Sequence, residues 1–180
     1  MQVIATQHPE VLLLRPKVFG DARGFFFESY NRKAFTEIGI DTEFVQDNHS
    51  RSAKGVLRGL HYQISQPQGK LVRVVAGEVF DVVVDLRRSS PHFGRVATMR
   101  LSAEAHDMAW IPPGFAHGFL VLSGHAEFVY KTTDYYAPEF ERCLLWSDSA
   151  LAIDWPLDGV PLLSGKDQAG RPLAECEVFA

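Results

Sequence analysis

The apolar residues of this chain recur at every second position, and this period of two constrains the fold more than any other feature. In EVFDVVVDL, residues 78–86, the side chains of Phe80, Val82, Val84 and Leu86 share one face, whereas Asp81 and Asp85 fall on the other. Successive side chains of a β-strand point to opposite faces, so alternation of this kind is typical of strands. The sequence therefore predicts a mainly β domain.

Further strands are predicted where short β-branched or aromatic runs end at Gly, Pro, Asp or Ser. They cover residues 11–14, 24–30, 43–47, 56–63, 70–76, 95–101, 108–111, 118–122, 126–133 and 142–146. One short helix is predicted after Asn31, a suitable N-cap, with Phe35 and Ile38 on one side and Gly39 as its end. Many strands separated by frequent turns indicate a sandwich, a jelly roll or a barrel.

The length and the charge restrict the class of partner. A chain of 180 residues is the size of a single domain. Its net charge of −4, with interspersed signs, lacks the basic stripe that nucleic-acid binding requires. No secretory signal and no apolar run of ~20 residues is visible, so we expect a cytoplasmic location and no membrane partner. Two cysteines, Cys143 and Cys176, fit a reduced compartment.

The densest polar cluster near strand residues is RGLHYQ, from Arg58 to Gln63. A lone histidine in a strand is more often a partly buried ring bonded to a carbonyl than a catalytic group. On a regular strand His61 and Arg58 point to opposite faces, unless Gly59 marks a bulge that reorients one of them. The sequence leaves both arrangements open.

A second cluster, PPGFAHGF, contains the spacing PxGxxH that ends at His117. Cupins, which are small jelly-roll barrels, carry this spacing in their second motif. Their first motif offers two histidines as HxH, but this chain has Gln63 in place of the second one. Because amides are poor ligands for transition metals, we expect a barrel without metal or other cofactor. His117 is then free for hydrogen bonding or for contact with a phosphate.

Three further residues have ordinary explanations when each is taken alone. Lys70 suits a strand-end lysine that reaches water, Tyr130 a buried tyrosine with a bonded hydroxyl, and Asp167 a solvated turn carboxylate. Together with His61 they fit proton removal from a carbon beside a ketone. His61, oriented by a carboxylate, is the base, and Lys70 stabilises the enolate oxygen. Tyr130 returns the proton on the opposite face, which inverts the carbon.

Eight co-linear segments resemble one known family, and together they span nearly the whole chain. They are residues 19–31, 44–52, 56–63, 70–87, 110–119, 130–141, 153–156 and 163–167. On these segments the chain resembles the dTDP-4-dehydrorhamnose 3,5-epimerases. The resemblance implies one domain over residues 1–180, with a cupin-type barrel of about residues 45–150 on which N-terminal strands and a C-terminal tail pack.

The family also implies a reaction and a set of site residues. The reaction is metal-independent inversion of C3 and C5 of dTDP-4-dehydro-6-deoxy-D-glucose, for dTDP-L-rhamnose and cell-surface polysaccharide synthesis. The implied catalytic residues are His61, Tyr130, Asp167 and Lys70. The implied substrate-binding residues are Arg23, Glu28, Gln46, Asn48, Arg58, His117, Glu141 and Lys166. Arginines suit the pyrophosphate, because their fork of donors matches phosphate oxygens.

The same resemblance gives expectations about the nucleobase and the partner subunit. Phe19 and Phe26 are candidates for stacking on the thymine. Family members are dimers that share N-terminal strands, so a homodimer is expected, with Arg23 and Glu28 near the partner's cavity. Departures from the family pattern are confined to the stretch after Glu141, where Cys143, Ser147 and Ser149 replace the expected Gly, Asn and Pro.

Three alternatives remain open from the sequence. A mono-epimerase that inverts only C3 or only C5 keeps most of the same residues, because the C4 ketone acidifies both neighbours. A metal-dependent cupin oxygenase requires a bound metal, and Gln63 argues against it. A non-catalytic nucleotide-sugar binding module has no feature in its favour, since all four catalytic candidates are present.

Overall fold

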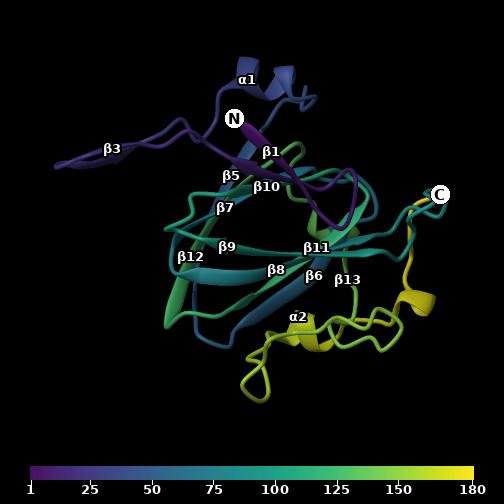
Figure 1. Ribbon diagram of the computed structural model, residues 1–180. Helices are drawn as coiled ribbons and strands as arrows, with labels where there is room; N and C mark the ends of the chain where they lie inside the picture. Colours follow the sequence, from purple (N-terminus) through teal and green to yellow (C-terminus); the bar gives the residue numbers. More distant parts are fainter.

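Two antiparallel sheets face each other in the computed structural model, which describes residues 1–180 (Figure 1). The first sheet has the strand order β1 (Gln2–Ala5), β2 (Leu12–Arg15), β10 (Met108–Ile111), β7 (Lys70–Ala76), β12 (His125–Thr132) and β5 (Gln46–Ala53). The second has the order β13 (Glu141–Cys143), β6 (Leu57–Gln63), β11 (Phe115–Val121), β8 (Glu78–Asp85) and β9 (Val96–Ser102). The predicted mainly β architecture is confirmed.

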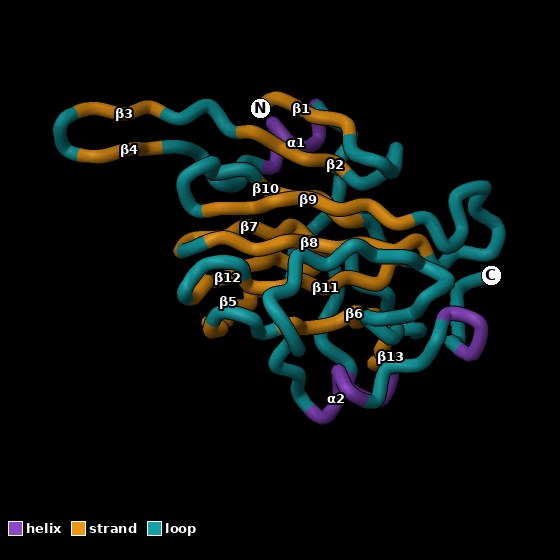
Figure 2. The backbone as a smooth tube through the Cα atoms, turned by 60° about the horizontal axis from the view of Figure 1, so that its bottom comes forward, coloured by secondary structure: helices purple, strands orange, loops and turns teal.

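Smaller elements lie around the two sheets. The hairpin of β3 (Phe19–Asp21) and β4 (Gly24–Phe26) projects away from the body (Figures 1 and 2). Helix α1 (Arg32–Glu37) begins as predicted, because the Asn31 side chain accepts a hydrogen bond from the Ala34 amide. The tail contains α2 (Gly165–Gln168), and 3₁₀ turns occur at Pro138–Phe140 and Leu173–Glu175. None of the helices has the length and apolar character needed to span a bilayer.

Apolar side chains pack in three layers. The space between the sheets holds a cluster that includes Val72 and Val74 of β7 and Val79 and Val83 of β8. The outer face of the second sheet is covered by the C-terminal tail, whose Leu151 and Trp155 pack with Leu57, Val82, Val84 and Leu120. Helix α1 covers the outer face of the first sheet, where Phe35 meets Leu14, Leu71 and Met108. Both faces of β8 are therefore buried, and Asp81 and Asp85 are 0% exposed.

Several predicted strand limits are wrong, for identifiable reasons. The strand predicted at 43–47 is β5 at Gln46–Ala53, whose residues are nearly all polar and hide the alternation. Strand β11 begins at Phe115 rather than at residue 118, inside the segment PPGFAHGF. The strand predicted at 24–30 ends at Phe26, and β1 and β3 have no counterpart in the prediction.

Candidate active site

A cavity of about 580 Å³ lies where strands of both sheets meet the C-terminal tail. It is lined by Gln46, Asn48, Val56, Arg58, His61, Gln68, Tyr130, Tyr136, Glu141, Leu162, Leu163, Ser164, Lys166 and Asp167. Eight of the residues singled out from the sequence therefore meet here, although they come from both sheets and from the tail. A concave site with a few converging polar groups is the usual form of a small-molecule site.

A bulge in β6 brings Arg58 and His61 to the same cavity. His117 pairs with His61 but Phe119 pairs with Arg58, so β6 has one residue more than β11 between the two pairs. Gly59 lies in this stretch with φ +118, and a Cβ there would sit 2.6 Å from the Gly118 Cα. Only glycine fits such a backbone at such an approach. The bulge at Gly59, one of the two arrangements left open by the sequence, is the one observed.

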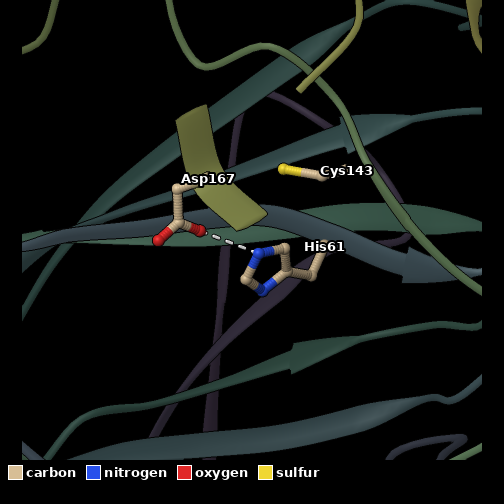
Figure 3. Close-up of side chains that lie close together, drawn as sticks. All are labelled: His61, Cys143 and Asp167. Atoms are coloured by element: carbon tan, nitrogen blue, oxygen red, sulfur yellow. Dashed lines mark ion pairs between the residues drawn. The ribbon is translucent and has the colours of Figure 1, made fainter. Parts of the chain in front are cut away.

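His61 and Asp167 meet although they are far apart in the sequence (Figure 3). His61 Nε2 lies 2.8 Å from Asp167 Oδ1, and the Asp167 side chain is only 3% exposed. The ring nitrogen approaches this oxygen without the angle of a hydrogen bond. A carboxylate beside Nε2 favours the tautomer with its proton on Nε2 and leaves the lone pair on Nδ1. This arrangement orients the His61 ring so that Nδ1 can act as a base.

Asp167 is fixed by the local structure of the tail. Its Oδ1 accepts a hydrogen bond of 2.9 Å from the Gly59 amide, and its Oδ2 accepts from the Ser164 amide at 3.0 Å and the Ser164 hydroxyl at 2.6 Å. Ser164 and Asp167 thus cap α2 reciprocally. Burial alone raises the pKa of Asp167, but contacts with His61, Ser164 and Gly59 outweigh it and hold the pKa well below its usual value. The carboxylate stays charged beside the imidazole.

Lys70 begins β7 on the face that looks into the barrel, as the alternation with Val72 and Val74 predicts. It lines a second, smaller cavity of about 90 Å³, which shares His61, Tyr130 and Glu141 with the larger one. Burial lowers the pKa of Lys70 to about 8, although the charge of Asp81 and that of Glu141 act in the opposite direction. The ammonium group is therefore held in a cavity where its hydration is poor.

Tyr130 lies on β12, in the sheet opposite to that of His61. Its ring packs on Phe128 with a centroid distance of 6.1 Å. Burial raises the pKa of Tyr130, while the positive charge of Arg58 opposes this effect. The phenol consequently keeps its proton and can donate it.

His117 occupies the barrel interior rather than the wall of the large cavity. It is 7% exposed, and its Nε2 lies 2.8 Å from Oδ2 of the fully buried Asp81. The other oxygen of Asp81 is buried without a hydrogen-bond partner. Of the two roles left open by the sequence, hydrogen bonding is the one observed for His117.

A cluster at the cavity mouth joins the tail to the barrel. Lys166 Nζ and the Tyr136 hydroxyl both donate to Glu141 Oε2, the latter at 2.9 Å. Burial opposes ionisation of Glu141, but these contacts and the nearby His61 lower its pKa. Tyr136 and Gln68 line the cavity and were not singled out from the sequence. The signal for Tyr136 was its place within residues 130–141, one of the family segments.

Besides Lys70 and His117, four predicted residues lie outside this cavity in the single chain. Phe19 and Phe26 are 54% and 66% exposed on the projecting hairpin. Arg23, in the same hairpin, forms an ion pair with Asp21, and exposed Glu28 accepts from the Asn31 amide group. None of these four side chains lines the cavity of its own chain.

Gln63 does not suit a metal at the usual cupin position. Its amide nitrogen donates to the carbonyls of Gln66 and Tyr135, and its amide oxygen accepts from the Ala137 amide. All the polar atoms of the Gln63 side chain thus form hydrogen bonds with the backbone of nearby loops. With His117 bonded to Asp81, the residues present do not fit the metal set of a cupin oxygenase.

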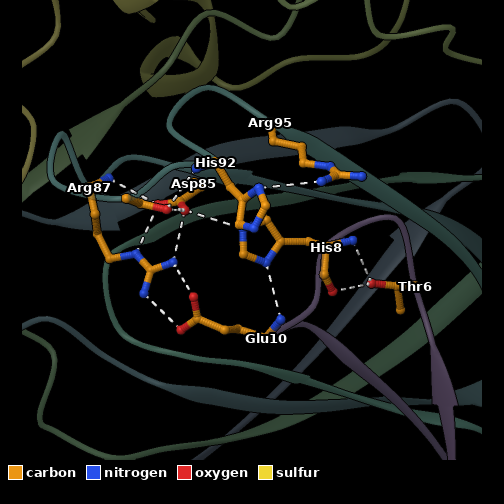
Figure 4. A network of polar contacts seen from close by, with 8 residues as sticks. Thr6, His8, Glu10, Asp85, Arg87, His92 and Arg95 are labelled. Atoms are coloured by element: carbon orange, nitrogen blue, oxygen red, sulfur yellow. Dashed lines mark hydrogen bonds and ion pairs between the residues drawn. The ribbon is translucent and has the colours of Figure 1, made fainter.

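A second pair of histidine and aspartate, His8 and Asp85, lies outside the cavity (Figure 4). His8 Nε2 lies 3.2 Å from Asp85 Oδ2, and the His8 Nδ1 accepts a hydrogen bond from the Glu10 amide. Asp85 also accepts from Arg87 and from the Ser90 hydroxyl. Both ring nitrogens are occupied and the pair is fully buried, so it pins the segment between β1 and β2 to the barrel rather than serving substrate.

Comparison with known proteins gives consistent matches. The family model described as dTDP-4-dehydrorhamnose 3,5-epimerase matches residues 5–175. The dTDP-4-dehydrorhamnose 3,5-epimerase of Pseudomonas aeruginosa is 64% identical over 172 residues, which cover 95% of this chain and 95% of that protein.

Solved structures agree with these matches. A dTDP-6-deoxy-D-glucose-3,5-epimerase from Legionella pneumophila, in complex with dTDP-4-keto-L-rhamnose, superposes with a TM-score of 0.95 at 55% identity, covering 98% of this chain and 94% of that one. A 3'-monoepimerase from Streptomyces bikiniensis, in complex with dTDP-quinovose, gives a TM-score of 0.88 at 34% identity, covering 97% and 88%. The similarity to the Legionella structure confirms the predicted cupin-type barrel.

Proposed function

Because the chain belongs to the dTDP-4-dehydrorhamnose 3,5-epimerase family, we propose that it is an isomerase of dTDP-rhamnose synthesis whose chemistry rests on the contact between His61 and Asp167. Its substrate is dTDP-4-dehydro-6-deoxy-D-glucose, and it inverts C3 and C5 to give dTDP-4-dehydro-L-rhamnose. The 64% identity to a 3,5-epimerase, against 34% to a 3'-monoepimerase, favours double over single inversion.

His61 is the base of this reaction. The C4 ketone acidifies the hydrogens on C3 and C5, and Nδ1 of His61 takes each proton in turn. Asp167 keeps the ring proton on Nε2 and stabilises the imidazolium that forms, because its carboxylate stays charged. Asp167 is therefore a positioning residue for His61.

Lys70 stabilises the enolate. When a carbon beside the ketone loses its proton, negative charge develops on the C4 oxygen, and a preorganised cation in a poorly hydrated cavity is most effective there. The depressed pKa of Lys70, about 8, is the sign of such a cavity. At neutral pH most of the lysine is protonated and ready to donate.

Tyr130 supplies the proton on the other face. Inversion needs an acid opposite the base, and His61 on β6 and Tyr130 on β12 belong to opposite sheets. Its raised pKa suits a donor that is neutral at rest. After each inversion the His61 imidazolium releases its proton to solvent and the Tyr130 phenolate takes one up, so that both groups are ready for the second carbon.

The remaining cavity residues bind the nucleotide sugar. Arg58 offers a guanidinium to the pyrophosphate, Gln46 and Asn48 offer amides bonded to each other at 3.0 Å, and Lys166 and Glu141 frame the mouth. His117 does not line the cavity; it is held by Asp81 in the barrel interior, where it supports the site from behind.

The substrate site is completed by a second copy of this chain. Arg23 and Glu28, together with Phe19 and Phe26, lie on or beside a hairpin that projects from the barrel, and so they reach the partner's cavity in a homodimer with exchanged N-terminal strands.

A stacking surface for the thymine also exists within the chain, because Tyr136 lines the mouth and is 46% exposed. Tyr136→Ala and Phe26→Ala, measured separately, decide which residue stacks on the thymine, because loss of the stacking residue raises the KM for substrate.

Turnover of paired variants tests the catalytic assignment. His61→Ala is expected to abolish product formation, whereas His125→Ala, at an exposed strand-end histidine, keeps it. Tyr130→Phe is expected to lose at least about 10²-fold in kcat, whereas Tyr135→Phe, 62% exposed, stays near wild type. Wild-type turnover in either cavity variant removes that residue from the mechanism.

A further inference from the structure

A thiol lies beside the proposed base and has no part in the reaction. Cys143 ends β13 and is the cross-strand partner of His61 on β6, so the two side chains are neighbours. One donor atom from each of His61, Cys143 and Asp167 lies within 4.8 Å of the other two. Figure 3 shows the three side chains close together, and they come from β6, β13 and α2.

The donor set matches the preference of a thiophilic divalent cation. Imidazole nitrogen, thiolate and carboxylate oxygen are the ligands that Zn²⁺ takes, at about 2.0 to 2.3 Å from the ion. Donors on a tetrahedral ion are then about 3.3 to 3.6 Å apart. The His61 and Asp167 atoms, at 2.8 Å, need to separate slightly, and the Cys143 sulfur, within 4.8 Å of both, is near enough to join them after a small movement.

The nitrogen that faces this space is not otherwise satisfied. His61 Nε2 is buried and has no hydrogen-bond partner of good geometry in the chain. The Cys143 thiol makes only a weak contact of 3.7 Å with the Leu144 carbonyl. The Cys143 thiol therefore loses no strong interaction when it turns toward a cation, and His61 exchanges its contact with Asp167 for a cation that both residues bind.

From this arrangement we propose that His61, Cys143 and Asp167 form an inhibitory site for a thiophilic divalent cation, with Zn²⁺ as the probe. The inhibitory effect rests on the proposed role of His61, whereas binding of the cation does not. The site differs from the metal position of cupins, because it uses neither Gln63 nor His117.

The proton balance explains why such a cation inhibits. The cation binds Nε2 of His61, and the single ring proton moves to Nδ1. The thiol proton of Cys143 leaves to the solvent as the sulfur becomes a ligand. Nδ1 now carries a proton and has no lone pair for the substrate, and Asp167 is drawn from the ring to the cation. Both functions of the pair are lost together.

Cobalt spectroscopy tests the binding step, since Co²⁺ is a coloured substitute for Zn²⁺ and a thiolate ligand gives an intense near-ultraviolet band. The chain has two cysteines, so Cys176 provides a matched control. The wild type and Cys176→Ala are expected to give the band, and Cys143→Ala and Cys143→Ser are expected to lack it. A band that persists in the Cys143 variants, or no band in the wild type, overturns the proposal.

A Zn²⁺ titration of turnover tests the inhibition. Cys143→Ala is expected to keep the metal-free rate, because Cys143 touches no substrate group, and to need at least about tenfold more Zn²⁺ for half inhibition. Equal sensitivity of the variant and the wild type overturns the site. A cobalt band without inhibition leaves the cation site standing and contradicts the role of His61 as base, so the two failures are distinguishable.

Discussion

Replacing Lys70 by Met is expected to make the protein more stable and nearly inactive. The side chain lies in the barrel next to the reacting groups, where burial lowers its pKa from 10.5 to about 8. Met has a similar length and no charge, so it fills the same space without the cost of an ammonium in a poorly hydrated cavity.

The magnitude follows from the two pKa values. Each tenfold change in proton affinity corresponds to about 1.4 kcal/mol, so the shift from 10.5 to about 8 means that keeping the ammonium in the folded state at pH 7 costs about 3.5 kcal/mol. Lys70→Met is expected to recover much of this in the free energy of unfolding. It also removes the cation from the enolate oxygen, a loss of about 10²- to 10³-fold in kcat.

The pH dependence gives a sharper signature. Between pH 8 and 10.5 the unfolded wild type binds more protons at Lys70 than the folded one, so the stability of the wild type rises with pH in this window. The advantage of Lys70→Met in the free energy of unfolding therefore shrinks from pH 8 upward and vanishes above about pH 10.5. The kcat/KM of the wild type falls above about pH 8, as the lysine loses its proton.

Urea unfolding at several pH values, together with steady-state kinetics, measures both effects. Lys33→Met, at an exposed lysine of α1, is the control and is expected to stay within about 0.5 kcal/mol of the wild type. A Lys70→Met protein that is destabilised by 1 kcal/mol or more, or whose stability difference does not depend on pH, refutes the reasoning.

Three further perturbations follow from the same structure. Asp167→Asn is expected to lower kcat by about 10²- to 10⁴-fold with little change in KM, because the substitution removes the charge behind His61; steady-state kinetics that show only a raised KM speak against the pairing. Gly59→Ala is expected to lose more than about 2 kcal/mol in chemical unfolding, because its Cβ would sit 2.6 Å from Gly118 Cα, whereas Gly124→Ala meets nothing within 4 Å; equal stability of the two variants contradicts the bulge. Finally, burial lowers the pKa of His8 despite Asp85 and Glu10, with His92 acting in the same direction as burial, so the wild type is expected to lose stability as the pH falls below about 6.5. His8→Gln should weaken this dependence in thermal melts between pH 7 and 5, and parallel curves would show that His8 does not titrate there.

The sequence predicts the mainly β class well because alternation survives wherever a strand has one apolar face. It does not predict which face of β8 looks into the barrel, since the tail buries the outer one and both faces are enclosed. As a result the fully buried Asp81 and Asp85 look, from the pattern alone, like residues of an exposed face. The limits of strand β5 are not predicted for the opposite reason, because its residues are nearly all polar and show no apolar period.

Eight of the predicted site residues line one cavity, but the way the chain brings them together was not predicted. Gly59 and Asp167 are 108 positions apart, and no local pattern indicates that the tail returns to β6. Only the family resemblance pointed to that contact. The orientation of Arg58 relative to His61 depended on a one-residue bulge, which a strand pattern with a regular period cannot reveal. Tyr136 was missed because an exposed aromatic residue has no periodic signature.

Solvent deuterium exchange tests the central claim most directly, namely that His61 removes the protons beside the ketone at both C3 and C5. The protein is incubated in D₂O with dTDP-4-dehydro-6-deoxy-D-glucose, and the label at each carbon is followed by nuclear magnetic resonance. The account predicts deuterium at C3 and at C5 with the wild type, and at neither carbon with His61→Ala. Label at only one carbon contradicts double inversion, and undiminished exchange in His61→Ala contradicts the base assigned to it.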